Sequence, residues 1–189
     1  MKYSLSEIKD ILKQRLSEKR YTHTLGVAKT AQKLAQQFHA NTVKAEIAGI
    51  LHDCAKEYQA KDLLQIAIDN NLELDPVDKQ TPHILHARVG ALVAQNEFGL
   101  EDKETLEAIK HHTLGKPNMN TLEEILFLAD AIEPSRKTEW SGPIKKCLEI
   151  DGINKAIAQA CKQTISEVLS KSRPIHHLTV ATYNFYLNN

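Results

Sequence analysis

The chain has 189 residues, of which 42% are hydrophobic and 25% are charged, and its formal net charge at pH 7 is zero. These totals are typical of a globular protein with one sizeable core, and the balanced charge excludes a long-range field that would attract nucleic acid or an anionic membrane. The three cysteines form no CxxC pair and no segment is apolar enough to span a membrane, so we expect a cytoplasmic protein with neither kind of partner.

Helical periodicity begins at the N-terminus. A Ser4-x-x-Glu7 capping box opens residues 4–18, and apolar residues follow it at helical spacing. The same spacing predicts a helix over residues 22–38, a deeply buried helix over 42–58 and a short helix over 62–70. The segment DPVDKQTP, residues 75–82, is predicted to be a loop because it is rich in Asp and Pro.

The second half of the chain is predicted to be helical as well. Residues 83–98 form a helix that stops at Gly99, and residues 102–111 form another. Thr121-x-x-Glu124 resembles a second capping box, at the start of a helix that Pro134 ends. The segment SRKTEWSGP, residues 135–143, is predicted to be a loop, and helices are predicted over residues 152–171 and 177–187.

No alternating strand pattern and no linker interrupts these helices. We therefore predict one all-α domain over residues 1–189, with a core of about 18–140 and a helical C-terminal extension of about 144–189.

Histidine and aspartate recur on or beside the apolar helical segments, at His23, His52, Asp53, His86, His112 and Asp130. Imidazole nitrogen and carboxylate oxygen without thiolate suit Fe, Mn, Co, Ni or Zn, and helical bundles build such sites in their cores. Because a carboxylate can bridge two ions, we predict one site from His23, His52, Asp53 and Asp130, and a second from Asp53, His86 and His112. Each residue can instead be a hydrogen-bonded or ion-paired core group, and the residues alone leave both interpretations open.

Several polar residues near these positions are candidates for contact with a phosphate. Lys56 follows Asp53 by three residues on the predicted helix, and Arg136 follows the break at Pro134; arginine binds phosphate through two parallel hydrogen bonds. The full set of candidates is Arg20, Lys56, Thr113, Gly115, Lys116 and Arg136. The sequence leaves open whether His83 or His111 takes a ligand role, and it leaves open the roles of Glu133, Trp140, His176 and His177.

The order of His23, His52-Asp53 and Asp130 on helices resembles the HD-domain superfamily of metal-dependent phosphohydrolases. Five segments add to this resemblance: KRYTHTLGVAKTAQKLA, AGILHDCAKEY, ILHARVGALVAQNEFG, AIKHHTLGKPNM and ILFLADAIEPSR. In this order and spacing they are similar to the YqeK family of bacterial HD-domain hydrolases, which are symmetrical bis(5′-nucleosyl)-tetraphosphatases. The resemblance covers about residues 18–140, and position 111 departs from it because His stands where an aromatic residue such as Tyr is expected.

The resemblance implies an HD-domain helical bundle with two metal ions, iron first, held by the six residues above. It further implies that a hydroxide shared by the two ions hydrolyses diadenosine tetraphosphate to two ADP, with Asp53, Lys56 and Arg136 in the catalytic machinery. A homodimer through outer helices is compatible with this pattern. Two alternatives stay open: an HD-domain enzyme for another nucleotide (a dNTP, a 5′-nucleotide or a signalling nucleotide), and a nucleotide-binding regulator without turnover.

Overall fold

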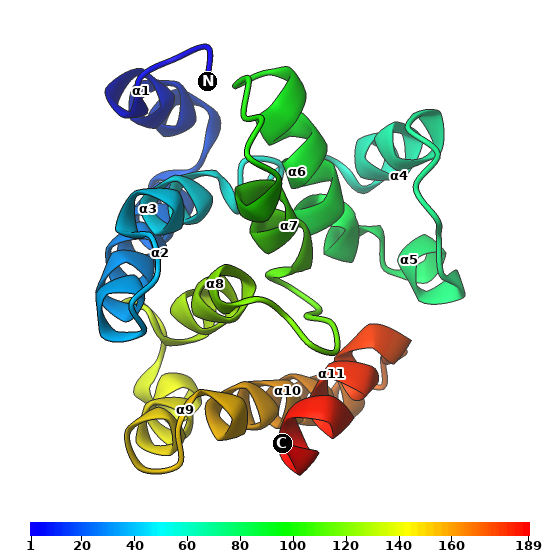
Figure 1. Cartoon of the computed structure of the whole chain (residues 1–189). Coiled ribbons are helices and arrows are strands. Elements are labelled where there is room, and N and C mark those ends of the chain that lie inside the picture. The colour runs from blue at the N-terminus through cyan, green and yellow to red at the C-terminus, as the bar shows by residue number, and fades with distance from the viewer.

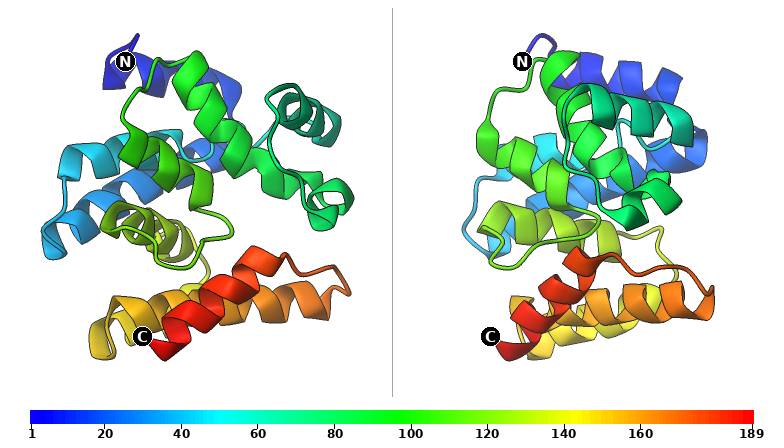
Figure 2. Two further views of the ribbon diagram at one scale, coloured as in Figure 1. Left: turned by 45° about the vertical axis from the view of Figure 1, so that its right-hand side comes forward. Right: turned by 90° about the vertical axis from the view of Figure 1, so that its right-hand side faces the viewer.

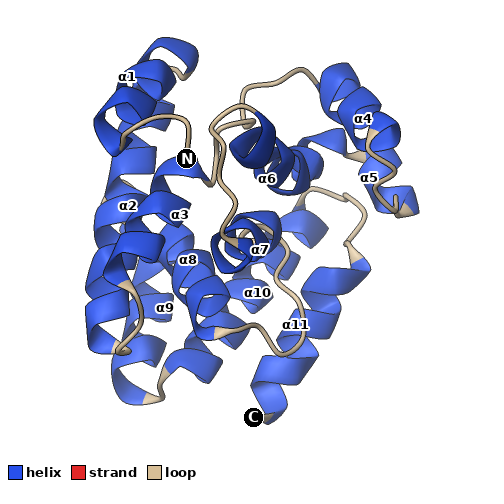
Figure 3. Cartoon of the chain, turned by 45° about the horizontal axis from the view of Figure 1, so that its top comes forward, coloured by secondary structure: helices blue, strands red, loops and turns tan.

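A computed structural model describes residues 1–189, and it contains helices and loops but no strand (Figures 1 and 3). The prediction of an all-α fold is confirmed. None of the helices is both long enough and apolar enough to cross a membrane. The elements in chain order are α1 (Leu5–Arg15), α2 (Glu18–Gln37), α3 (Thr42–Leu51), α4 (Ala60–Asp69), α5 (Pro76–Gln80), the 3₁₀ helix η1 (Pro82–Leu85), α6 (His86–Asn96), α7 (Lys103–His111), α8 (Thr121–Ile132), α9 (Thr138–Ile150), α10 (Ile153–Ser170) and α11 (His177–Asn188).

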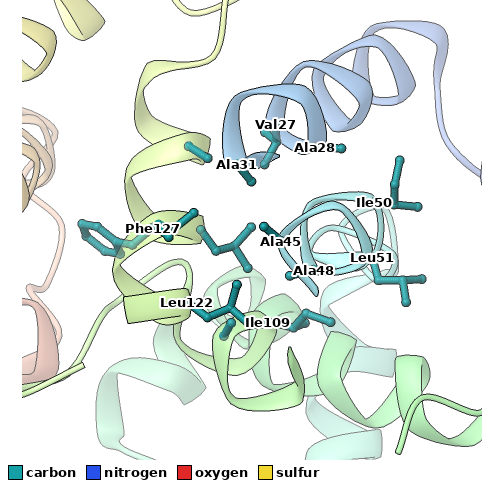
Figure 4. Close-up of a cluster of buried hydrophobic side chains, with 14 of the residues drawn as sticks. Val27, Ala28, Ala31, Ala45, Ala48, Ile50, Leu51, Ile109, Leu122 and Phe127 are labelled. Carbon is teal, nitrogen blue, oxygen red and sulfur yellow. The ribbon is translucent and has the colours of Figure 1, made fainter. Parts of the chain in front are cut away.

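The centre of the core lies between α2, α3, α7 and α8 (Figure 4). Ala31, Ala45 and Ala48 are fully buried there, and their small side chains let α2 and α3 pack closely along their length. Larger side chains such as Ile109 and Leu122 fill the remaining space, and each contributes about 1.5–3 kcal/mol by burial. This packing fixes the relative position of α2, α3, α7 and α8, which carry or adjoin five of the six predicted ligands.

Helices α9, α10 and α11 form a layer below α8 in Figure 1, and both views of Figure 2 show the same layer. Helix α10 packs against α9 and α11 and also contacts α8. The N-terminus and α1 lie at the opposite end of the molecule (Figure 1). The division into a core of about 18–140 and an extension of about 144–189 remains a prediction, although α9–α11 follow each other in this one layer.

The predicted helix over residues 42–58 is too long. Helix α3 ends at Leu51, and residues 52–57 form successive turns, in which Cys54 N–H and Lys56 N–H donate to carbonyl oxygens three residues earlier, at 3.1 and 2.9 Å. Lys56 therefore does not share a helix face with His52 and Asp53, and the turns, rather than helical spacing, place these three side chains together.

Two predicted loops contain helices. Asp75 caps α5, and Pro76 occupies its first turn, where proline is favourable because its missing N–H has no partner in a helix. Helix α9 begins at Thr138 and continues through Pro143, with Ser141 and Ile144 buried on its inner face. Packing against α8 and α10 outweighs the turn-forming composition of this segment.

Two helix starts differ from their predicted positions by a few residues. The capping box of α8 consists of Asn120 and Glu123 rather than Thr121 and Glu124, because the Asn120 carboxamide oxygen accepts the Glu123 N–H and the helix therefore begins one residue earlier. The predicted helix over residues 83–98 divides into η1 and α6. The capping box of Ser4 and Glu7 at α1 is confirmed.

Candidate metal centre

Four imidazole rings and two carboxylates meet in the interior of the bundle. The Nε2 atoms of His23 and His52 lie 3.3 Å apart, and those of His86 and His112 lie 3.2 Å apart. All four histidines are buried, whereas Asp130 is partly exposed. The structure thus brings together all six predicted ligands: His23, His52, Asp53, His86, His112 and Asp130.

The ring nitrogens that face the centre are the Nε2 atoms, because the Nδ1 atoms of three of the four rings bond to the backbone. The Nδ1 atoms of His52, His86 and His112 lie 2.7, 2.6 and 2.8 Å from the carbonyl oxygen three residues earlier in the chain. A carbonyl oxygen only accepts, so each Nδ1 carries a proton, and Nε2 is the nitrogen that presents a lone pair inward when the ring is neutral. Burial also lowers the pKa of His86 to about 4, which keeps this ring neutral at pH 7. Neutral imidazoles in this orientation fit a metal cation between them.

Asp53 lies between the two histidine pairs. Its Oδ2 is 3.3 Å from His52 Nε2 and 3.8 Å from His23 Nε2, and its Oδ1 is 3.2 Å from His86 Nε2 and 3.6 Å from His112 Nε2. Oδ1 is buried without a hydrogen-bond partner. Burial acts to raise the pKa of Asp53, but positive charge at His52 and hydrogen bonds from the protonated forms of His112, His52 and His86 outweigh it and hold the pKa well below its usual range. The ionised carboxylate therefore offers one oxygen to each pair.

His23 is oriented by a carboxylate instead of a carbonyl. Its Nδ1 donates to Glu133 Oε1 at 2.9 Å, and its Nε2 lies 3.0 Å from Asp130 Oδ1. Gly26 leaves the space for Glu133, because a Cβ atom at this position would lie 2.6 Å from Glu133 Oε2. The sequence left the role of Glu133 open, and its only signal was the three-residue spacing from Asp130.

Four predicted phosphate-binding side chains already contact the ligand set. Arg20 Nη1 donates to Asp53 Oδ2 at 2.7 Å, and Arg136 Nη2 donates to Asp130 Oδ1. Lys56 Nζ and Thr113 Oγ1 each lie 3.0 Å from His86 Nε2. Burial lowers the pKa of Lys56 from its usual value. These four side chains are partly exposed, so they border the centre on its open side.

Gly115 and Lys116 are not brought to the centre. The Gly115 N–H donates to the His111 carbonyl oxygen at 2.8 Å. The backbone of Gly115 has a φ of 66°, and a Cβ atom at this position would collide with Thr182 of α11. Lys116 Nζ instead pairs with Glu123 at 2.9 Å. The structure thus gives these two residues contacts within the fold.

The neighbouring histidines lie outside the ligand set. His111 Nδ1 lies 2.7 Å from Glu123 Oε1, and the exposed His83 contributes its carbonyl oxygen to His86. Cys54 is a buried thiol that donates to the Gly90 carbonyl oxygen, and burial raises its pKa. No thiolate is therefore present beside His52 and Asp53.

The remaining residues of open role lie in the C-terminal helices. His176 caps α11 and, with His177, faces α5. Trp140 packs partly buried against the core from α9.

Comparisons with known proteins agree with this architecture. A family model described as the HD domain matches residues 20–135. A protein of Bacillus subtilis (strain 168) named bis(5′-nucleosyl)-tetraphosphatase, symmetrical, is 39% identical over 177 residues, 94% of each chain. A protein of the same name from Staphylococcus aureus (strain NCTC 8325 / PS 47) is 35% identical over 97% of this chain and 94% of its own. The crystal structure of a predicted HD superfamily hydrolase involved in NAD metabolism, from Clostridium acetobutylicum, superposes with a TM-score of 0.94 at 37% identity, over 100% of this chain and 99% of that one.

Proposed function

The chain belongs to the HD-domain family, in the branch of the symmetrical bis(5′-nucleosyl)-tetraphosphatases, and on this premise we propose that it hydrolyses diadenosine tetraphosphate to two ADP. The observation that carries the proposal is the position of Asp53, whose two oxygens face two separate pairs of imidazole lone pairs. This is the donor arrangement of a two-metal phosphohydrolase, in which one carboxylate bridges both ions.

HD-domain hydrolases bind divalent metal ions, and the two clusters of His and Asp at this centre can hold them. We propose that His23, His52, Asp53 and Asp130 hold one ion, and that Asp53, His86 and His112 hold the other. We propose iron as the metal; a donor set of nitrogen and oxygen without thiolate also accepts Mn, Co, Ni or Zn. When bound, such ions lower the pKa of a water molecule and polarise the phosphoryl group.

The cationic side chains at the open side bind the tetraphosphate. Arg20 and Arg136 lie against Asp53 Oδ2 and Asp130, where they can contact phosphate oxygens on one side of the centre. Lys56 and Thr113 lie against His86, and they can contact phosphate oxygens on the other side. In the hydrolysis, water adds to a central phosphorus and the bridging phosphorus–oxygen bond breaks. These cations offset the charge that the departing ADP gains.

Gly115 and Lys116 shape the loop after His112 and remain weaker candidates for substrate contact, because their polar groups already have partners within the fold. A cytoplasmic location is proposed from the cysteines, which are all free, as is usual in a reducing compartment. A homodimer through outer helices remains a prediction.

The test is product analysis. We would incubate the metal-loaded protein with diadenosine tetraphosphate, separate the nucleotides by chromatography and repeat the reaction with a chelator. The expected product is ADP alone, and the chelator and the variant His52→Ala should both abolish its formation. Formation of AMP and ATP would exclude symmetrical cleavage, and full turnover by His52→Ala after metal removal would exclude the metal centre. Reloading with Fe²⁺, Mn²⁺, Co²⁺, Ni²⁺ or Zn²⁺ in turn then tests the choice of iron.

A further inference from the structure

A cleft of about 390 Å³ lies between the C-terminal helices and two residues that border the candidate metal centre. Lys56 and Thr113 line it, and the polar atoms of both lie 3.0 Å from His86 Nε2. Its opposite wall is formed by α10, the loop after α10, and the start of α11, which lie outside the residues that the HD-domain model matches. The volume is within the range of about 300–1,000 Å³ that small-molecule sites occupy.

We propose that this cleft binds one nucleoside of the dinucleoside tetraphosphate, and that the C-terminal helices thereby make the site selective for a substrate with two nucleosides. This inference rests on the proposed function. Symmetrical cleavage requires the middle of the phosphate chain to lie at the centre, with one nucleoside diphosphate on each side. The cations of the centre also lie on two sides, Arg20 and Arg136 against one set of ligands, and Lys56 against the other.

The cleft opens from the Lys56 side. Neither Arg20 nor Arg136 lines it, so a phosphate chain that crosses the centre from these arginines passes Lys56 and Thr113 and enters the cleft. The nucleoside at the end of that half then lies between the core and the C-terminal helices.

The lining of the cleft suits a nucleoside. Apolar side chains from both walls cover its faces, and they belong to Val77, Ile84, Leu114, Ile165, Val168 and Ile175. Such apolar walls can contact both faces of an uncharged purine ring. At the outer end, Lys171 pairs with Glu167, whereas Arg173 is exposed and has no carboxylate partner. Arg173 is therefore free to contact the base or the ribose hydroxyls of a nucleoside in the cleft.

Two variants test this proposal in the full-length, metal-loaded protein. Val168 is partly buried in the cleft wall, so Val168→Trp fills the space that the nucleoside needs. Leu169, the next residue of α10, is 59% exposed and lies outside the cleft, so Leu169→Trp is its matched control. Arg173→Ala removes the outer contact, and Lys162→Ala, at an exposed position of α10 away from the cleft, is the control for loss of a surface cation.

The measurements are kcat and KM for diadenosine tetraphosphate, together with the metal content and the unfolding temperature of each variant. We expect Val168→Trp to raise KM about 10-fold or more, a typical effect of a steric change in an apolar pocket. Arg173→Ala should raise KM by a smaller factor, and for both variants kcat and metal content should stay within about twofold of the unmodified protein. The controls should keep the original KM.

The outcomes separate this inference from the function on which it rests. If the unmodified protein produces ADP and neither variant changes KM relative to its control, the nucleoside does not occupy the cleft, and this inference alone is overturned. If the unmodified protein does not hydrolyse diadenosine tetraphosphate, both proposals fail. If Val168→Trp does not fold, the KM of Arg173→Ala still tests the inference, because the exposed side chain of Arg173 is not needed for packing.

Discussion

Histidine and aspartate side chains meet in two regions of this molecule, and the positions of four histidines at the ends of helices make the two regions chemically different. At the metal centre, His52, His86 and His112 each follow the last residue of a helix. Helix C-termini leave carbonyl oxygens without partners, so these rings donate Nδ1–H backward and present the Nε2 lone pair. His176 caps the start of α11, where its Nδ1 accepts the N–H of Leu178 at 3.1 Å. Its Nε2 therefore carries a proton, and it does not offer a lone pair.

The second region, which we call the α5–α11 cluster, consists of Asp75, Asp78, Arg88, His176 and His177. Arg88 pairs with Asp78, and His177 Nδ1 lies 2.9 Å from Asp75 Oδ2. His176 Nε2 is 3.6 Å from Asp78 Oδ1, so its proton faces a carboxylate. The contacts of His176 and His177 with Asp78 and Asp75 connect α11 to α5. Proximity of His and Asp is thus common to both regions, and the protonated ring nitrogen distinguishes a candidate metal site from an ion-pair network.

The largest expected effect is at the metal centre. Asp53→Asn replaces the carboxylate that we propose to bridge two ions with an amide whose NH₂ group cannot ligate, so we expect the variant to bind at least one ion fewer. Activity should fall by more than about 100-fold, because residues that merely orient a metal ligand already cost about 10–100-fold. Elemental analysis and the initial rate with diadenosine tetraphosphate measure both effects. Two retained ions with normal activity would show that Asp53 has only a structural role.

The corresponding change in the α5–α11 cluster should affect stability and leave the metal content unchanged. Asp78 is completely buried, and Asp78→Ala leaves the Arg88 guanidinium, which is mostly buried, without its partner. Loss of one partner of a buried pair costs about 3–5 kcal/mol, which urea unfolding can measure. Asp75→Ala removes a more exposed pair with His177 together with the cap of α5, and it should cost less, about 0.5–2 kcal/mol. A fall in metal content in Asp78→Ala would contradict the distinction between the two regions.

The sequence was sufficient for the helical fold and for the six residues of the centre, for a physical reason. Buried His and Asp are costly without partners, so their recurrence on apolar segments predicts a shared site, and the ability of a carboxylate to bridge two ions divides them into two sets. The same patterns failed where tertiary packing decides the local structure. Pro143 reads as a helix breaker, yet it lies inside α9, and the helix expected through residue 58 ends at Leu51.

The groups that support the centre were harder to predict than the ligands. Glu133 reaches His23 only because Gly26, on a different helix, leaves room for it, and no spacing within one segment contains that information. The α5–α11 cluster joins residues that are about a hundred positions apart, such as Asp75 and His177. Long-range pairs of this kind depend on how helices pack, which periodicity alone does not determine.

Glu133 allows a finer test with a matched control in the same protein. Glu133 and Glu123 are both 1% exposed and both contact a histidine Nδ1, that of His23 at 2.9 Å and that of His111 at 2.7 Å. Only His23 faces the centre. We expect Glu133→Gln to weaken metal binding about 10–100-fold, as is typical for a carboxylate that orients a ligand, and Glu123→Gln to leave it unchanged. Competition with a metal-binding dye measures the affinity, and equal effects of both substitutions would contradict this role of Glu133.

The smallest expected effect is the pH response of the α5–α11 cluster. Burial lowers the pKa of His176, while Asp78 and Asp75 act to raise it, and His177 and Arg88 act to lower it further. An unfolded chain has a histidine pKa of about 6.5, so below that pH the unfolded state binds more protons than the folded state, and His176 lowers stability as the pH falls. His176→Asn keeps a helix cap and does not titrate. Urea unfolding of the metal-free protein at pH 7.5 and 5.5 should therefore show a smaller loss of stability on acidification for the variant. Since both proteins share every other titrating group, the difference between their two pH responses isolates His176. Equal responses would mean that the pKa of His176 is the same in the folded and unfolded states, and they would contradict the lowered pKa that its burial predicts.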